Sequence, residues 1–147
     1  MGEDFSRERY EALAEFRYRI RRFQHFSEQM AREAGLEPQQ HQLLLALRGL
    51  PEGTRPTIGA VAERLCVQHH TAVALVDKLE ERSLLLRRRS TTDKREVLLS
   101  LTPEGETILR NLSTLHRQQL AEMGPDLVEA LQSLVSVERP KDNRRKS

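Results

Sequence analysis

Apolar positions recur with a helical period on both sides of a short turn near the middle of the chain. Two stripes have this spacing: Ile58, Val61, Ala62 and Leu65, then Ala72, Leu75, Val76 and Leu79. The spacing i, i+3, i+4, i+7 is typical of one buried face on each of two helices. The small Ala62 and Ala72 side chains allow these helices to cross closely. The pattern predicts a helix-turn-helix, with Thr57 as the first N-cap and a second helix over residues 68–82.

After this second helix the pattern changes from helical to extended. Leu84–Arg89 and Val97–Leu101 are predicted strands, and the turn-forming residues 90–93 lie between them. Five cations stand against one acid, Asp93, over residues 84–95, a local net charge of 5 − 1 = +4; they are Arg87, Arg88, Arg89, Lys94 and Arg95. The pattern predicts a protruding cationic hairpin, so the fold is expected to be a winged helix-turn-helix.

Helical patterns flank this module. Residues 6–34 form a long predicted helix that ends at Gly35, and its apolar stripe includes Leu13, Phe16, Ile20, Phe23 and Met30. Pro38 begins the next helix, whose run of apolar residues 43–47 is expected to be fully buried. Thr102 and Pro103 are an N-cap and a first-turn proline of a further helix. Gly124-Pro125 is expected to break that helix, with Asp126 starting a shorter one.

The apolar stripes of the flanking helices exceed what a small module covers. A second copy of the chain would bury them, whereas the alternative is an intramolecular bundle in a monomer. The predicted fold is mainly α with a small β wing. We expect residues 1–137 to form a single domain, with 6–34 and 102–137 as dimerisation helices and 38–101 as the winged helix-turn-helix module, and residues 138–147 to be a disordered basic tail.

Composition narrows the class of protein. The chain has 147 residues, of which 37% are hydrophobic and 31% charged, as expected for one soluble domain. The formal net charge is only +2, so a nucleic-acid surface must come from local clustering. No apolar run approaches the length of a membrane span, and the N-terminus lacks a signal-peptide pattern, which predicts a cytoplasmic protein. The single cysteine excludes an intramolecular disulfide.

The outer face of the second helix carries short and medium side chains suited to a DNA groove. Candidate DNA contacts are Gln68, His69, His70, Thr71, Val73 and Ala74, together with the hairpin cations Arg87, Arg89, Lys94 and Arg95. Amide and imidazole groups can bond base edges, and small apolar groups can touch thymine methyls. Alternatively, Gln68 or Thr71 caps the helix or bonds a phosphate. The hairpin charge run, taken alone, would also fit a solvated face.

Residues 57–105 resemble the multiple antibiotic resistance regulator (MarR) family. The resemblance rests on the helix-turn-helix ending VDKLEERSLLLRR, on Asp93-Lys94-Arg95 as the family's D-x-R, and on LSLTPEGE with its L-T-x-x-G. It implies that the helix matching 68–82 enters the major groove. It also implies that Arg95 reaches the minor groove or its phosphates while Asp93 holds the wing in shape. An intertwined dimer is likewise implied.

One position departs from the family pattern. Ser83 stands at the end of the recognition helix where the family usually has glycine. Glycine tolerates positive φ without a Cβ penalty. Ser83 therefore either costs about 1 kcal/mol of strain there or changes the turn.

Cys66 has three interpretations. It is a small buried side chain, or a redox switch whose thiol pKa is lowered by the following helix N-terminus, or a zinc ligand together with His69 and His70. Adjacent histidines on a helix diverge by about 100°, so both cannot join one ion with Cys66. No metal or other cofactor is expected. The histidines fit DNA contacts better, and their protonation would strengthen binding at lower pH.

The resemblance also implies a small, often aromatic and anionic effector. Residues that would border its pocket are Tyr18, Arg21, His25 and His41. Each of them also fits a surface or interface position. The sequence holds no catalytic motif, so no enzyme is expected. We predict a homodimeric DNA-binding regulator, most simply a repressor of a pseudo-palindromic operator; the alternatives are an interaction or architectural module and a Cys66-based redox sensor.

Overall fold

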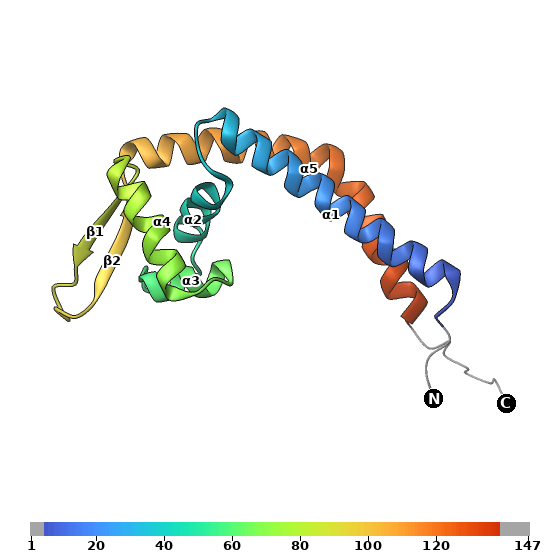
Figure 1. The fold of residues 1–147 in the computed structure, drawn as a ribbon, viewed down its shortest axis with the longest axis horizontal. Coiled ribbons are helices and arrows are strands. Elements are labelled where there is room, and N and C mark those ends of the chain that lie inside the picture. Colours follow the sequence, from blue (N-terminus) through green and yellow to red (C-terminus); the bar gives the residue numbers. More distant parts are fainter. Residues whose placement is uncertain (1–4, 139–147) are drawn as a thin grey trace. The chain divides into compact units, whose positions relative to one another are not determined.

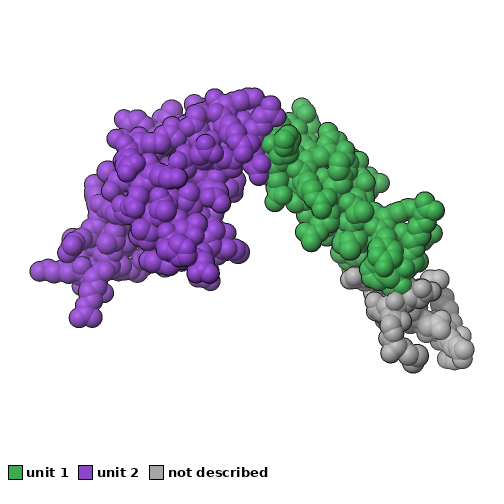
Figure 2. Space-filling model, in the orientation of Figure 1, with its two compact units in different colours: residues 1–26, 116–147 green, residues 27–115 purple. Residues whose placement is uncertain are grey.

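The computed structural model describes residues 5–138 and confirms a mainly helical winged-helix fold with one two-stranded sheet (Figure 1). Two compact units make up the chain (Figure 2): unit 1 contains the described residues 5–26 and 116–138, and unit 2 contains residues 27–115. The elements in order are α1 (Arg7–Glu33), α2 (Pro38–Arg48), α3 (Ile58–Leu65), α4 (His69–Glu81), β1 (Leu85–Arg89), β2 (Val97–Leu101) and α5 (Pro103–Glu138). Residues 139–147 of the predicted basic tail lie outside the described residues.

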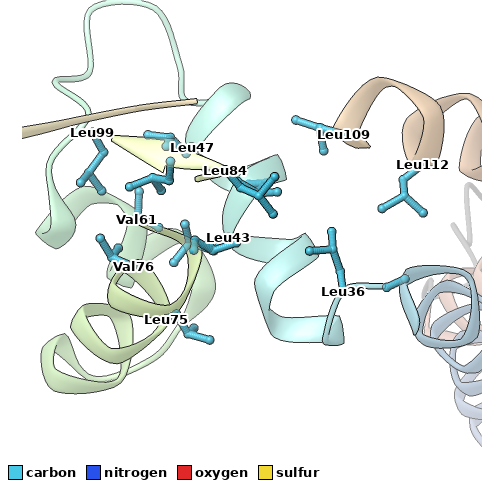
Figure 3. Packing of buried hydrophobic residues seen from close by; sticks show 14 residues of the cluster. Leu36, Leu43, Leu47, Val61, Leu75, Val76, Leu84, Leu99, Leu109 and Leu112 are labelled. Carbon is cyan, nitrogen blue, oxygen red and sulfur yellow. The ribbon is translucent and has the colours of Figure 1, made fainter. Parts of the chain in front are cut away.

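The core of unit 2 lies where α3 and α4 pack against α2 and the base of the wing (Figure 3). Its most deeply buried side chains include Leu43, Leu44, Val61, Val76, Leu79 and Leu85. All four members of the α4 stripe are buried, which confirms the helical period predicted for residues 72–79. Full burial of the α2 run is wrong at Leu45, which is 44% exposed. A helix rotates by about 100° per residue, so three consecutive leucines cannot all face one core.

The wing is an antiparallel hairpin of β1 and β2, as predicted. Leu85 pairs with Leu101 at its base and Arg89 with Val97 at its far end. Leu85 and Leu99 are buried, whereas Leu86 and Ser100 are exposed, so the side chains alternate between core and solvent. The amide of Leu99 also donates to the Pro56 carbonyl at 2.8 Å, which ties β2 to the loop before α3.

Unit 1 consists of two antiparallel helical segments, one from α1 and one from α5. Arg19 forms an ion pair with Asp126 at 3.3 Å, and the rings of Phe23 and Phe26 lie edge-on against His116. The partners in α5 have lower residue numbers as the residue numbers in α1 increase, so the two segments run in opposite directions. No helix among residues 5–138 has the length and apolar character of a membrane span.

The predicted break at Gly124-Pro125 is wrong, because α5 continues as one helix to Glu138 with Pro125 inside it. A proline inside a helix lacks an N–H and crowds the carbonyl four residues earlier, at a cost of about 3 kcal/mol. Met123 and Leu127 on either side are half-buried and Ala130 is buried. Packing on both sides of the proline offsets this local cost.

Candidate nucleic-acid interface

The N-terminal half of α4 presents a polar face to solvent. Gln68 is the N-cap residue, and its side chain makes no capping hydrogen bond, so the capping alternative does not hold for it. Gln68, His69, His70 and Ala74 are exposed, whereas Thr71 and Val73 are half-buried. The buried stripe on the opposite side fixes this rotation of the helix, since the stripe packs against α2 and α3. The face therefore offers donors, acceptors and methyl groups at the start of a helix.

The turn before α4 ends α3 in a left-handed residue. Cys66 has φ +55°; its amide donates to the Glu63 carbonyl, and the next amide, of Val67, donates to Ala62. This pair of bonds is the Schellman motif, in which glycine is the usual left-handed residue. The Cys66 side chain is exposed, so its interpretation as a buried apolar residue is wrong. The redox hypothesis stays a prediction.

The same motif ends α4 at Ser83. Its φ is +58°, its amide donates to Glu80 at 2.9 Å, and Leu84 donates to Leu79 at 3.0 Å. Of the two expectations for Ser83, the strained left-handed turn is therefore the one observed, and the turn is not rebuilt. Leu79 and Leu84 are both buried, which supplies the apolar contact that accompanies such helix ends.

Thr102 and Gly105 hold the base of the wing, which explains the L-T-x-x-G spacing physically. The Thr102 hydroxyl donates to the Ser83 carbonyl at 2.6 Å and accepts the Gly105 amide at 3.0 Å, so it caps α5 as predicted. A Cβ on Gly105 would lie 2.1 Å from the backbone oxygen of Leu84. A residue larger than glycine would push the end of the recognition helix and the start of α5 apart.

Arg87 joins the wing to the recognition helix. Its guanidinium donates to Asp77 and, at 3.1 Å, to Glu80, and its amide also donates to Glu80. The hydrogen bond to Asp77 raises the pKa of Arg87, partial burial opposes this, and the bond to Glu80 raises it further. Of the four predicted wing contacts, Arg87 thus has its charge held by carboxylates of α4. A contact between Arg87 and DNA stays a prediction.

The other three predicted wing cations are open to solvent. Arg89, Lys94 and Arg95 are exposed and form no ion pair with any residue from 5 to 138. Asp93 lies in the turn between the strands, where its carboxylate accepts the Arg95 amide at 3.0 Å. An aspartate that bonds an amide two residues ahead shapes a turn locally.

Sequence reasoning missed the partners that hold the wing in place. Arg55 bonds Glu96 and Ser90 across the chain, and the acids of α4 bond Arg87. Asp77 gave a signal, because an acid on a helix predicted to contact DNA is repelled by the phosphates unless a cation compensates its charge. Arg55 gave none, since its partner lies 41 positions away.

The four predicted pocket residues are divided between the units. Tyr18, Arg21 and His25 are exposed on the α1 segment of unit 1, and His41 is buried in unit 2 at 2% exposure. Nitrogen Nδ1 of His41 lies 3.5 Å from the side-chain nitrogen Nε2 of Gln42. The effector pocket stays a prediction.

Within residues 5–138, no cluster of three or more metal-binding side chains occurs. All three candidate ligands are exposed: Cys66 is the C-cap residue of α3, and His69 and His70 are the first two residues of α4. The candidate interface combines a polar helix face with a cationic hairpin.

Comparison with known proteins places this interface within a matched segment. Residues 34–96 match the sequence profile of the MarR family. The Bacillus subtilis (strain 168) HTH-type transcriptional repressor MdtR is 33% identical over 72 residues, which cover 49% of this chain and 44% of that protein. This chain therefore spans about half the length of the curated relatives it matches.

Solved structures match more of the chain. The transcriptional repressor CouR, bound to a 23-mer DNA duplex, is 30% identical with a TM-score of 0.63, covering 79% of this chain and 83% of CouR. A MarR family transcription regulator, SP03579, has a TM-score of 0.72 at 19% identity, covering 87% of this chain and 86% of that one. The second likeness shows the fold alone. The first joins sequence and fold over most of both chains.

Proposed function

Because this chain belongs to the MarR family, we propose that it is a sequence-specific regulator of transcription that binds double-stranded DNA. The observation that carries the proposal is the pairing, in unit 2, of an exposed polar face on α4 with a wing whose outer cations are unpaired among residues 5–138. The Arg87 bonds join these two parts. A helix face reads bases, and a cationic hairpin binds the backbone.

The α4 face supplies the groups for base reading. Gln68, His69 and His70 can donate to and accept from base edges in the major groove, while Ala74 and the half-buried Val73 offer methyl contacts to thymine. These side chains lie in the first two turns of the helix, the part that helix-turn-helix proteins insert into the groove. Thr71, which is half-buried, suits a phosphate contact.

The wing supplies the sequence-independent part of the affinity. Lys94 and Arg95 at the tip and Arg89 on β1 are free to meet phosphates or a narrow minor groove, where the negative potential is strongest. If the dimer neutralises about six phosphates, raising the salt concentration from roughly 50 to 200 mM should lower its affinity for DNA by about 10³-fold.

Unit 1 supports a homodimer as the active form. Eight of its large apolar side chains are 42% or more exposed: Phe5, Tyr10, Leu13, Tyr18, Leu120, Val128, Leu131 and Val135. An apolar surface this extensive is characteristic of a protein interface. A second copy would present two α4 helices to half-sites about 10 base pairs apart in a pseudo-palindromic operator.

The proposed dimer also suggests a mode of regulation. We propose that the dimer represses transcription and that a small effector releases it by favouring a spacing of the two α4 helices that no longer fits successive grooves. Such an effector must bind the released state more tightly than the DNA-bound state, because equal affinity shifts nothing. The similarity to MdtR, which is a transcriptional repressor by name, supports repression as the simplest mode.

Selection of bound duplexes from a randomised pool, followed by competition binding, tests the proposal. We expect an inverted repeat to be enriched and to bind at least about 10³-fold more tightly than a scrambled duplex. Equal affinity for both would contradict sequence-specific regulation and favour an architectural module. Binding to neither would remove DNA as the partner.

A further inference from the structure

The length of the loop at the tip of the wing does not by itself determine the conformation of that loop. Residues 90–96 join β1 to β2, and this is longer than the loops of about two to five residues whose turn type sets a hairpin. Lys94 and Arg95 lie within it. Other bonds must fix where these two cations point.

Ser90 is the centre of the bonds inside the tip. Its hydroxyl oxygen accepts the amides of Thr92 and Asp93, both at 3.3 Å, and lies 3.0 Å from the Thr92 hydroxyl. The amide of Ser90 donates to the Glu96 carbonyl at 2.9 Å, which closes the loop. Ser90 is 6% exposed although its neighbours are open to solvent. The tip therefore depends on one buried hydroxyl and its last residue, Glu96.

Arg55, which lies outside the wing, bonds both Ser90 and Glu96. Its Nε donates to Glu96 Oε1 at 2.8 Å, its Nη2 lies 2.7 Å from Glu96 Oε2, and Nη2 also donates to the Ser90 hydroxyl at 3.2 Å. Two parallel bonds between a guanidinium and a carboxylate fix orientation as well as distance. The next residue, Pro56, accepts the amide of Leu99 in β2. The dipeptide Arg55-Pro56 before α3 thus contacts the wing twice: the Arg55 side chain bonds the tip, and the Pro56 carbonyl bonds strand β2.

From this geometry we propose that Arg55 is a positioning residue for DNA binding, which holds the wing tip so that Lys94 and Arg95 are already placed for the phosphate backbone. The inference rests on the proposed function. The charge of Arg55 is directed to Glu96, so Arg55 acts through the tip and not on DNA. Fixing a flexible segment before binding increases affinity, because the ordering cost is no longer paid during association.

A competing explanation is that Arg55, whose side chain is 54% exposed, binds a phosphate directly. The two explanations differ in the sign of one effect. If charge alone matters, a protein without the negative charge of Glu96 should bind DNA more tightly than the wild type. The same change weakens binding if Glu96 is needed to anchor Arg55 and the tip.

The experiment measures anisotropy of a labelled duplex of about 30 base pairs and mixed sequence with the full chain, because wing contacts are sequence-independent. We expect Glu96→Gln and Arg55→Ala each to weaken binding about three- to tenfold, and the exchanged pair Arg55→Glu with Glu96→Arg to restore most of it. Glu52→Gln is the matched control. Glu52 is exposed in the same loop and has no ion pair within residues 5–138, so its neutralisation should leave binding equal or slightly tighter.

A second measurement does not depend on DNA. Hydrogen exchange of the Thr92, Asp93 and Arg95 amides should accelerate in Arg55→Ala, while exchange in α4 stays as in the wild type. Unchanged tip exchange, or tighter binding by Glu96→Gln, overturns the positioning role while leaving the proposed function intact. A wild-type chain that binds no duplex overturns both, whatever the exchange shows.

Discussion

Units 1 and 2 both contain helices with a regular apolar period, but among the described residues large apolar side chains are fully buried in unit 2 alone. In unit 2, Leu43, Leu44, Leu79 and Leu85 have no exposed surface. Among the described residues of unit 1, Ala130 is the one apolar side chain that is buried, and it is small. The difference shows that a helical period identifies a face that needs covering but not the element that covers it. Unit 2 covers most of its own apolar faces, whereas eight large apolar side chains of unit 1 stay exposed.

The largest effect is expected where unit 2 packs backbone against backbone. Gly105→Ala would place a Cβ 2.1 Å from the Leu84 carbonyl oxygen, which cannot move without shifting the end of α4. We expect the free energy of unfolding to fall by about 3 kcal/mol in urea titrations. Gly124→Ala in unit 1 is the control: no atom lies within 4 Å of its added Cβ, and alanine should raise helix stability by about 1 kcal/mol. Equal effects at both sites would contradict the comparison.

The next effect tests whether unit 1 is covered by a second copy. Leu131→Asp places a charge on a side chain that is 46% exposed, so a monomer would tolerate it. In a dimer the lost burial alone is about 2 kcal/mol, which weakens self-association at least about 30-fold in sedimentation experiments. Leu45→Asp, on a residue of unit 2 that is 44% exposed, should leave the mass unchanged. A wild-type chain that sediments as a monomer at micromolar concentration would remove the dimer.

DNA binding should depend on the cations of unit 2 and not on those of unit 1. Arg95→Ala removes an exposed wing cation, and we expect a loss of about 1–3 kcal/mol in duplex affinity with a shallower salt dependence and unchanged stability. Arg17→Ala removes an equally exposed charge from unit 1 and should have no such effect. Anisotropy titrations at several salt concentrations compare the two. Equal losses would place DNA contacts in both units.

The smallest effect concerns the helix ends of unit 2. Gly35, Cys66 and Ser83 all adopt positive φ in the same motif, but only the first is glycine. Ser83→Gly and Cys66→Gly should each raise the free energy of unfolding by up to about 1 kcal/mol, because the left-handed strain at Cβ is removed. Gly35→Ala should lower it by a similar amount. Thermal unfolding of the three variants checks the signs, and a destabilised Ser83→Gly would show that contacts of the serine side chain outweigh its backbone strain.

Local patterns predicted most of the winged helix. Thr57 and Thr102 accept the amides three residues ahead, as their positions before apolar stripes indicated, and both strands lie within a residue of the predicted bounds. These features depend on residues only a few positions apart, so spacing in the sequence reports them directly. The candidate DNA face on α4 was predictable for the same reason, because the buried stripe determines which side remains exposed.

Long-range contacts explain what the pattern did not give. The continuity of α5 through Pro125 depends on which neighbours pack there. The grip of Arg55 on Glu96 and the pairing of Arg87 with Asp77 depend on separate elements meeting in space. Neither kind of fact leaves a periodic trace in the sequence.

By itself, the sequence determined the helices, the turn residues, the hairpin and the concentration of positive charge on it, since each arises from propensities and spacings within about ten residues. Only the tertiary structure decided which cations remain free, which are held by carboxylates, and which apolar faces stay uncovered. The physical reason is that charge pairing and burial are properties of surfaces brought together by folding, and their outcome depends on distances that chain order does not contain.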